Sequence, residues 1–459
     1  MQQVGRVWGW LTGKSHESEA MENERQQRMR QVVRTGISSG GARGVAILVQ
    51  IAIVPLTLGY LGQERYGMWM VISSLIAFLQ MADLGLSNGL IGIVADRVAK
   101  KQNHELRKII ISAYAVLSFI TLALILFAVL IIPQINWQWL LNFQSVLARQ
   151  EITDAVLVLV VVALVSVPFN ASQQIRLGMQ EGATNGLFTS SGSVLNLILI
   201  IVVIHMEKGL PWLVAASMSG SLLAQIIHAG MLCKKFCTVE KQVSYSPVEG
   251  DTVVIGALLS KGVLFFVLQL SALVSYSLDN LLVSHFLGSS EVSVYAVTMK
   301  LFSIPGMLLS LYLVGMWPAY ADASARNDKP WIEKIFWRSL RVSIAFNSLI
   351  SLLLLLAGNW LIHIWTKGIV QPDIDLLVGM ALWGILNAIG GNIAVLLNGL
   401  HVVRFQVLIA LGALIMNAGL SLWLVQKIGV SGPIWGSVAT LLGSYVIIII
   451  YIKKMFSRW

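Results

Sequence analysis

Charged residues are scarce in this chain. Lysine, arginine, aspartate and glutamate make up 12% of its 459 residues, about half of the roughly 25% that soluble domains carry. Hydrophobic residues reach 56% and recur in long runs, which a compact soluble core could not absorb. A bilayer can, because each helical span needs about 20 apolar residues. The scarcity of charge therefore excludes a soluble globular protein and indicates an all-α integral membrane protein.

Cysteines and enzyme motifs are also scarce. The two cysteines, Cys233 and Cys237, are too few for a disulfide framework or a zinc cluster, and we interpret them as small apolar residues. The segment GWLTGKS at 9–15 is one residue short of a phosphate-binding loop, and no strand precedes it. No loop is long enough to fold as a catalytic domain. We therefore expect no enzyme, no catalytic residue, no metal site and no cofactor.

Twelve apolar runs follow one another along the chain, and most are long enough to span a bilayer as a helix. They lie near residues 36–60, 66–95, 109–132, 154–176, 184–206, 210–233, 254–287, 291–321, 340–366, 374–399, 402–426 and 430–452. The prediction is about 12 transmembrane helices.

The positive residues predict the orientation of these spans. With the N-terminus in the cytoplasm, 24 of the 32 lysines and arginines fall in cytoplasmic segments, five in outer segments and three inside spans. Cytoplasmic loops of membrane proteins carry such an excess. We therefore predict a multi-pass protein with both termini in the cytoplasm. The same distribution explains the net charge of +10 without a nucleic-acid partner.

A short pattern repeats in the two halves of the chain. LGQERYGMW at 61–69 joins the first and second spans, and LGSSEVSVY at 287–295 joins the seventh and eighth, 226 residues later. Both are Leu-Gly turns followed by an acid and an aromatic. Glycine-containing turns between helices are common, so chance remains an alternative. With six spans per half, the repeat predicts two six-helix bundles related by a pseudo-twofold along the membrane normal. The predicted parts are a cytoplasmic N-terminal segment at 1–35, bundles at 36–233 and 253–453, a cytoplasmic linker at 234–252 and a cytoplasmic tail at 454–459.

The stretch from Leu61 to Asn88 carries a family resemblance. Its Leu-Gly-x-Glu-x-Tyr-Gly-x-Trp turn and the later Asp83-Leu84-Gly85-Leu86-Ser87-Asn88-Gly89 resemble polysaccharide transporters of the multidrug/oligosaccharidyl-lipid/polysaccharide flippase superfamily. These include O-antigen and other lipid-linked oligosaccharide flippases. Twelve spans in two halves extend the resemblance over nearly the whole chain.

The resemblance implies two bundles around a central cavity that opens alternately to each side. The implied function is movement of an isoprenoid-pyrophosphate-linked oligosaccharide to the outer leaflet of a bacterial inner membrane, for surface polysaccharide synthesis. The implied partners are the lipid-linked glycan, the bilayer and glycan polymerase or assembly enzymes. By analogy with the superfamily, an ion gradient would bias the direction, with H⁺ and Na⁺ both open.

Five ionisable residues inside the predicted spans are candidates for the function, because charge in a bilayer is costly. Counting residues from the outer turns places Arg43 and Asp83 at matching depths, ~25 Å below the turn, and Asp279 and Lys300 at ~12–14 Å. Lys261 lies near the cytoplasmic end. In one interpretation Arg43–Asp83 and Asp279–Lys300 are neutralising pairs. In the other, Arg43, Lys261 and Lys300 line the cavity and bind the diphosphate or acidic sugars of the lipid-linked glycan, while Asp83 and Asp279 pair with them or exchange the coupling ion. For Lys261 the alternative is snorkelling to the inner headgroups.

Other functions remain open at this point. A multidrug exporter of the same superfamily is the first alternative, although cationic drugs would favour an acidic cavity. A membrane glycan polymerase or ligase would need a large outer loop with catalytic groups. A scaffold without transport would tolerate loss of the charged residues.

The longest predicted outer loop, 133–153, contains Trp137 and Trp139, which we expect at the membrane interface.

Overall fold

All regular structure in the described part of the chain is helical. The computed structural model describes residues 14–80, 90–91, 93–94, 97–98, 102–179, 181, 183–238, 267, 270–271, 274, 277–400 and 402–459. Its elements are α2 (Lys14–Ser74), α3 (Ile76–Gln80), α5 (Asn103–Ile131), η1 (Ile132–Gln134), α6 (Trp137–Leu141), α7 (Val146–Gly178), α8 (Ala183–His205), α9 (Leu210–Thr238), α11 (Ser289–Ala325), α12 (Lys329–Thr366), α13 (Ile374–Gly399), α14 (Val403–Ile428), η2 (Gly429–Ser431) and α15 (Gly432–Phe456). A further unlabelled helix occupies 277–287. The predicted all-α fold is confirmed.

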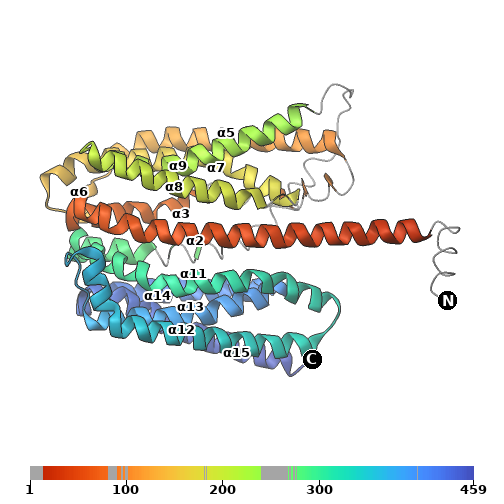
Figure 1. Cartoon of the computed structure of the whole chain (residues 1–459). Helices are drawn as coiled ribbons and strands as arrows, with labels where there is room; N and C mark the ends of the chain where they lie inside the picture. Colours follow the sequence, from red (N-terminus) through yellow and green to blue (C-terminus); the bar gives the residue numbers. More distant parts are fainter. Residues whose placement is uncertain are drawn as a thin grey trace.

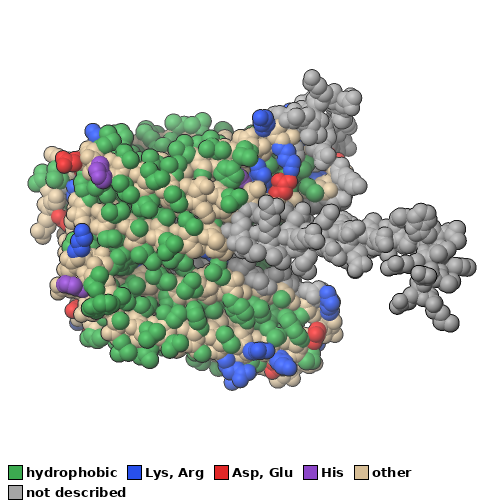
Figure 2. Space-filling model, viewed as in Figure 1, with side chains coloured by type: hydrophobic (Ala, Val, Ile, Leu, Met, Phe, Trp, Pro, Cys, Tyr) green, Lys and Arg blue, Asp and Glu red, His purple; other side chains and the backbone are tan. Residues whose placement is uncertain are grey.

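The helices have the length and surface of membrane spans. Nine helical stretches of the described residues are long and apolar enough to cross a bilayer. Two of them contain a turn, since Gly62 interrupts α2 and η2 separates α14 from α15. Large apolar side chains such as Phe119 and Leu356 are exposed. On the face that Figure 2 shows, hydrophobic surface covers the middle of the molecule while most charges lie at its ends. The chain is therefore a multi-pass membrane protein.

The helices form two bundles with α2 between them (Figure 1). Helices α5, α7, α8 and α9 pack among themselves, and α11 to α15 do the same. Helix α2 packs on α8 of the first bundle and on α11 and α12 of the second. This arrangement has the two bundles that the repeat predicted. The residue bounds given above for the bundles and the linker stay predictions.

The two ends of the molecule differ. Helix α6 and the break in α2 lie at one end, called here the turn end, and the start of α2 and the C-terminus lie at the other, the terminal end (Figure 1). Helix α2 begins at Lys14 and continues into the first span without a break before Gly62. The predicted separate segment at 1–35 is thus helical from Lys14 and continuous with the first span.

Two glycines make the repeated turns. Gly62 has φ 73° and Gly288 has φ 97°, values in the left-handed region that glycine adopts without a steric penalty. Beyond Gly62 the chain runs back into the bundle. The Gln63 carbonyl accepts a hydrogen bond from Ser293, near the start of α11. The Ser74 carbonyl accepts a hydrogen bond from Ser277 deeper in the molecule. The tight turn predicted in each half is therefore present.

The contact between the two turns is itself nearly symmetric. The offset of 226 residues relates Gln63 to Ser289 and Gly67 to Ser293. The Ser293 hydroxyl donates to the Gln63 carbonyl, and Gly67 lies against the Ser289 carbonyl. Each contact is the other with the halves exchanged, as a twofold axis requires. This pair of contacts supports the predicted pseudo-twofold.

The buried clusters show where the bundles are joined. The largest cluster combines residues of both halves at the turn end, among them Tyr66 and Leu141 with Tyr295 and Ile362. At the terminal end a cluster around Phe336 belongs only to the second half. A third, which includes Leu106, Ile175 and Leu232, belongs only to the first. Among the described residues, a shared core therefore joins the halves at the turn end, while each half has its own core at the terminal end.

Substitution of Gly67 by alanine should loosen this joint. An added Cβ would stand 1.6 Å from the Ser289 carbonyl oxygen, which is backbone and cannot rotate away. Overpacking of this kind costs about 1–3 kcal/mol. We expect the purified Gly67→Ala protein to melt several degrees below the wild type in a thermal unfolding assay.

Gly59→Ala is the matched control on the same helix. No atom lies within 4 Å of a Cβ at Gly59, and alanine is the better helix former by about 1 kcal/mol. Its melting temperature should equal or exceed that of the wild type. Equal melting temperatures for the two variants would show that the close approach of the turns is not maintained.

Candidate functional site

One face of α11 meets α2 at the turn end. Ser289, Ser293, Ala296 and Lys300 are spaced by four, three and four residues, so they share one face of the helix. Opposite them lie Gln63, Tyr66 and Gly67 of α2. These seven residues are called the seam. Small side chains dominate it, which lets the two backbones approach closely.

The short helix α6 closes the seam at the turn end. The Leu141 carbonyl at its C-terminus accepts hydrogen bonds from the Ser284 hydroxyl at 2.7 Å and from the Ser289 hydroxyl at 2.8 Å. The next residue, Asn142, donates its side-chain amide to the His285 carbonyl at 3.2 Å. Two hydroxyls of the second half thus satisfy a carbonyl that the end of α6 leaves without a helical partner.

Lys300 lies at the inner edge of the seam and reaches across it. Eleven residues after Ser289, it is ~16 Å along α11 from the helix start. Its ammonium donates to the Tyr66 hydroxyl at 3.1 Å and lies 5.5 Å from the centre of the Tyr66 ring. The candidate cation of the second half is therefore held by an uncharged group of the first half.

Arg43 also crosses between the halves, nearer the terminal end. Its side chain is exposed, and a guanidinium nitrogen donates to the Ser310 hydroxyl of α11 at 2.8 Å. Ser310 is ten residues beyond Lys300 on the same helix, or ~15 Å. The two described candidate cations thus lie at two levels of the interface between α2 and α11, where an anion could contact them.

Asp279 belongs to a different environment, inside the second half. Its side chain is 2% exposed, and one carboxylate oxygen accepts from Tyr295 at 2.7 Å and from Ser437 at 3.4 Å. Asn417 donates to that serine at 2.9 Å. The other carboxylate oxygen, the Asn417 carbonyl oxygen and the Thr440 hydroxyl have no hydrogen-bond partner among the described residues. We call Asp279, Tyr295, Asn417, Ser437 and Thr440 the Asp279 cluster.

The neutralising pair Asp279–Lys300 is not formed. Both residues are described, and each has the uncharged partners given above. The depth estimate ignored direction around the helix axis. On α11, Tyr295 and Lys300 are five residues and therefore roughly 140° apart. Asp279 bonds the face that carries Tyr295, whereas Lys300 projects from the face toward α2.

Two predicted site residues lie outside the described residues. Asp83 falls in the gap at 81–89, and Lys261 falls before residue 267. The predicted pair Arg43–Asp83 and the predicted role of Lys261 therefore stay predictions. The described residues bring Arg43 and Lys300 to one interface and place Asp279 away from it.

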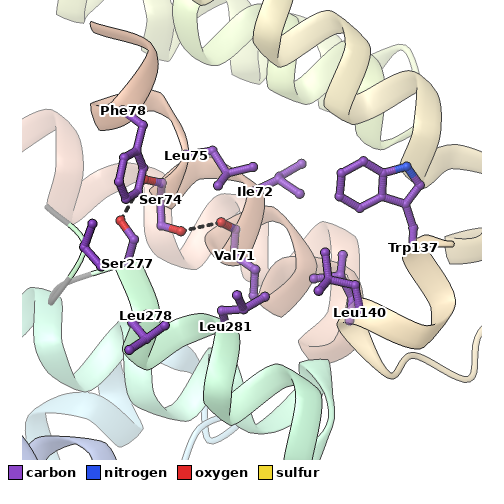
Figure 3. Close-up of a pocket in the computed structure, with 12 residues that line it drawn as sticks. Val71, Ile72, Ser74, Leu75, Phe78, Trp137, Leu140, Ser277, Leu278 and Leu281 are labelled. Atoms are coloured by element: carbon purple, nitrogen blue, oxygen red, sulfur yellow. Dashed lines mark hydrogen bonds between the residues drawn. The ribbon is translucent and has the colours of Figure 1, made fainter. Parts of the chain in front are cut away.

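An apolar pocket of about 210 Å³ lies beside the seam. It is lined by Ile72 and Phe78 of the second span, Trp137 of α6 and Leu281 of the seventh span (Figure 3). Its two serine hydroxyls are already bonded, Ser74 to the Val71 carbonyl at 2.5 Å and Ser277 to the Ser74 carbonyl at 3.1 Å. The pocket suits an apolar group and offers a sugar or phosphate no free donor.

Trp137 corrects one expectation about the outer loop. Its side chain is 7% exposed and its indole N–H donates to the Ile132 carbonyl at 3.1 Å, so it packs in the core beside the pocket. Trp139 is 68% exposed, as a residue at a membrane interface can be. The loop folds into α6, and this turns the two tryptophans in different directions.

Sequence reasoning missed Tyr66 as a partner of Lys300 and Tyr295 as a partner of Asp279. Both tyrosines stand in the repeated turn segments, so the repeat marked their neighbourhood. The spacing of Ser289, Ser293, Ala296 and Lys300 could have identified the face of α11 that meets α2. Nothing in the sequence specified which helix lies opposite that face.

The fold is shared with solved transporters. An inward-facing multidrug resistance MATE family transporter of the MOP superfamily matches with a TM-score of 0.74 at 14% identity, over 92% of this chain and 98% of that one. The lipid II flippase MurJ in an inward closed conformation matches with a TM-score of 0.68 at 14% identity, over 92% of this chain and 87% of that one. At these identities the similarity shows the fold alone.

Sequence relatives are described as O-antigen transport proteins. A putative O-antigen export protein of Yersinia pseudotuberculosis is 22% identical over 63% of this chain, and the match spans just under two thirds, 65%, of that protein. A putative O-antigen transporter of Salmonella typhimurium is 22% identical over 84% of this chain and 88% of its own length. The family model described as polysaccharide biosynthesis protein matches residues 32–324, well over half of the chain. The chain belongs to this polysaccharide biosynthesis protein family.

Proposed function

We propose that this protein is a flippase that moves an isoprenoid-pyrophosphate-linked oligosaccharide from the cytoplasmic to the outer leaflet of a bacterial inner membrane. The observation that carries the proposal is the placement of Arg43 and Lys300 between two halves whose described residues share a core only at the turn end. A sugar-phosphate head group cannot cross hydrocarbon unaided, because it would lose its hydrogen bonds to water. A polar path between the halves removes that barrier.

The proposed orientation rests on the positive residues. The terminal end carries Lys329, Lys334, Arg338, Lys453 and Lys454, and such clusters favour the cytoplasmic side. The turn end is then the outer end. In this orientation the described conformation is joined on the outer side and receives substrate from the cytoplasm.

The cations match the chemistry of a pyrophosphate. A guanidinium presents a planar fork of donors to phosphate oxygens, and an ammonium provides a compact charge. Arg43 is exposed and held by a serine, so a phosphate could replace that partner. The isoprenoid tail would remain in the bilayer while the glycan passes between the halves. Release on the outer side requires the seam to separate, which is alternating access.

The same charges argue against export of cationic drugs. Among the described residues, the charged side chains that cross between α2 and α11 are cations, while Asp279 is enclosed in the second half. A cationic drug would meet repulsion at Lys300. The structural similarity to multidrug transporters is a similarity of fold and does not transfer their substrates.

Asp279 is proposed as the group that exchanges the coupling ion. A buried carboxylate is costly unless its oxygens are hydrogen-bonded or it binds a cation or a proton. One oxygen of Asp279 has no described partner, and two further oxygens of its cluster are in the same state. H⁺ and Na⁺ both remain candidates. The site is separate from the proposed substrate cations, so ion and glycan could be bound together.

Loss of either interface cation should impair flipping. A charge-assisted hydrogen bond is worth about 1.5–3 kcal/mol, so we expect Arg43→Ala and Lys300→Met each to lower transport about tenfold or more. The measurement is transbilayer movement of lipid-linked oligosaccharide in a strain that lacks the protein and its homologues, restored with each variant at equal membrane levels. Precursor should accumulate on the cytoplasmic face.

Lys427→Met is the matched control. Lys427 is exposed at the turn end, so this substitution removes the same charge at a position away from the interface. It should restore transport fully, and Lys300→Arg should restore part of it. Normal crossing of precursor in the strain without the protein would refute the flippase assignment. Drug accumulation assays on the same strains would then test the exporter alternative.

Asp279→Asn should uncouple transport from the ion gradient. The amide keeps the size and the Tyr295 hydrogen bond but cannot carry the charge that exchanges with H⁺ or Na⁺. In proteoliposomes with an imposed gradient, we expect the variant to lose the gradient-driven stimulation while glycan binding persists. Collapsing the H⁺ gradient and the Na⁺ gradient in turn identifies the ion.

Asp375→Asn is the control for this experiment, since Asp375 is exposed in the first turn of α13. It should respond to the gradient as the wild type does. Retention of full gradient stimulation in Asp279→Asn would remove Asp279 from the coupling mechanism.

A further inference from the structure

The hydrogen bond between Lys300 and Tyr66 places a charged group at the contact between the two halves at the turn end. Tyr66 is 0% exposed, and its ring packs edge-on against Trp69 with centroids 5.9 Å apart and an interplanar angle of 86°. Packing therefore fixes the ring. Its hydroxyl accepts from the Lys300 ammonium at 3.1 Å. The hydroxyl belongs to the first half and the ammonium to the second.

This bond exists only while the seam is closed. Tyr66 directly precedes Gly67, which lies against the Ser289 backbone, and Lys300 shares the helical face of Ser289 and Ser293. Any separation of α2 from α11 at the turn end must break the bond. Among the described residues, Lys300 forms no ion pair that would hold it elsewhere. A cation that loses Tyr66 in this apolar surrounding needs another acceptor.

We infer that Tyr66 is a positioning residue that holds Lys300 at the inner edge of the seam until the substrate's diphosphate takes the ammonium and thereby favours opening of the turn end. This inference rests on the proposed function and deepens it. It assigns Lys300 to contact with the diphosphate and Tyr66 to the coupling between binding and opening.

The coupling follows from competition for one ammonium. In the closed state the diphosphate must displace the tyrosine hydroxyl to reach Lys300. In the open state that bond is already broken, so the diphosphate binds without displacing anything. A ligand shifts an equilibrium by its difference in affinity for the two states. The diphosphate therefore binds the open state more tightly and, by the same factor, promotes opening.

The test measures separation of the two halves at the turn end. Glu207 of the first half and Lys367 of the second are both exposed there. Cysteines at these positions, in full-length protein with Cys233 and Cys237 changed to serine, carry spin labels in lipid nanodiscs. Double electron–electron resonance then gives the distribution of distances. The probe is farnesyl diphosphate, and farnesol, which lacks the phosphates, is its control.

Farnesyl diphosphate should move the wild-type distribution to longer distances, and farnesol should not. Tyr66→Phe keeps the packed ring but loses the hydroxyl. Without ligand, the ratio of open to closed protein should be on the order of tenfold higher in Tyr66→Phe than in the wild type, as expected for loss of one hydrogen bond to a charged group. Farnesyl diphosphate should shift the distances of this variant little further. A merely structural role for Tyr66 would lower stability without removing this response.

Tyr320→Phe is the matched control. Tyr320 is 2% exposed and packs within the second half at the terminal end, so its loss should leave the distances and the ligand response unchanged. If Tyr66→Phe and the wild type bind farnesyl diphosphate in calorimetry and shift alike, the role of Tyr66 is refuted and the proposed substrate stands. If the wild type binds no farnesyl diphosphate, the proposed contact between Lys300 and the diphosphate is refuted, and so is the transfer of the ammonium from Tyr66 to the diphosphate.

Discussion

The approach of Gly67 to the Ser289 backbone sets the distance between the two halves at the turn end. Lipid offers no hydrophobic drive for helices to associate, so close packing of small residues and hydrogen bonds must hold them together. The seam supplies both, because serine hydroxyls reach carbonyls on α2 and α6. Such bonds are individually weak in membranes, on average about 0.6 kcal/mol. A joint of this kind is compatible with the opening that the proposed function requires.

Asp279 and Lys300 occupy different positions relative to this joint, one inside the second half and one between the halves. Asp279 is buried in the second half and bonded to Tyr295 of α11 and Ser437 of α15, so relative motion of the halves need not disturb it. Lys300 bonds across the halves, and any motion at the turn end alters its surroundings. In the proposed mechanism, Asp279 would keep its ion while the halves move, and the surroundings of Lys300 would change with the opening of the seam.

Some of this was readable from the sequence, and the reason differs by feature. Span number, all-α class and the turns at Gly62 and Gly288 follow from apolar run length and from the freedom of glycine. The expected depths of Lys300 and Asp279 come from helical rise and stay predictions. Their partners do not come from helical rise, because depth leaves the direction around the axis open and the sequence does not say which helices are neighbours. Trp137 was misplaced for a related reason, since the fold of α6 decides which tryptophan faces inward.

The seam contacts follow the pseudo-twofold, whereas Lys300 does not. The offset of 226 residues maps the contact of Gly67 with Ser289 onto that of Gln63 with Ser293, so the joint is nearly self-complementary. The same offset maps Lys300 onto Ser74, whose hydroxyl bonds within its own helix. The backbone contact thus retains the symmetry, while the charge is present in one half alone. In the proposed flippase cycle, a symmetric joint alone would favour neither direction, and Lys300 would give the substrate a group to bind on one side. Directional coupling would then have to come from the residues that break the repeat.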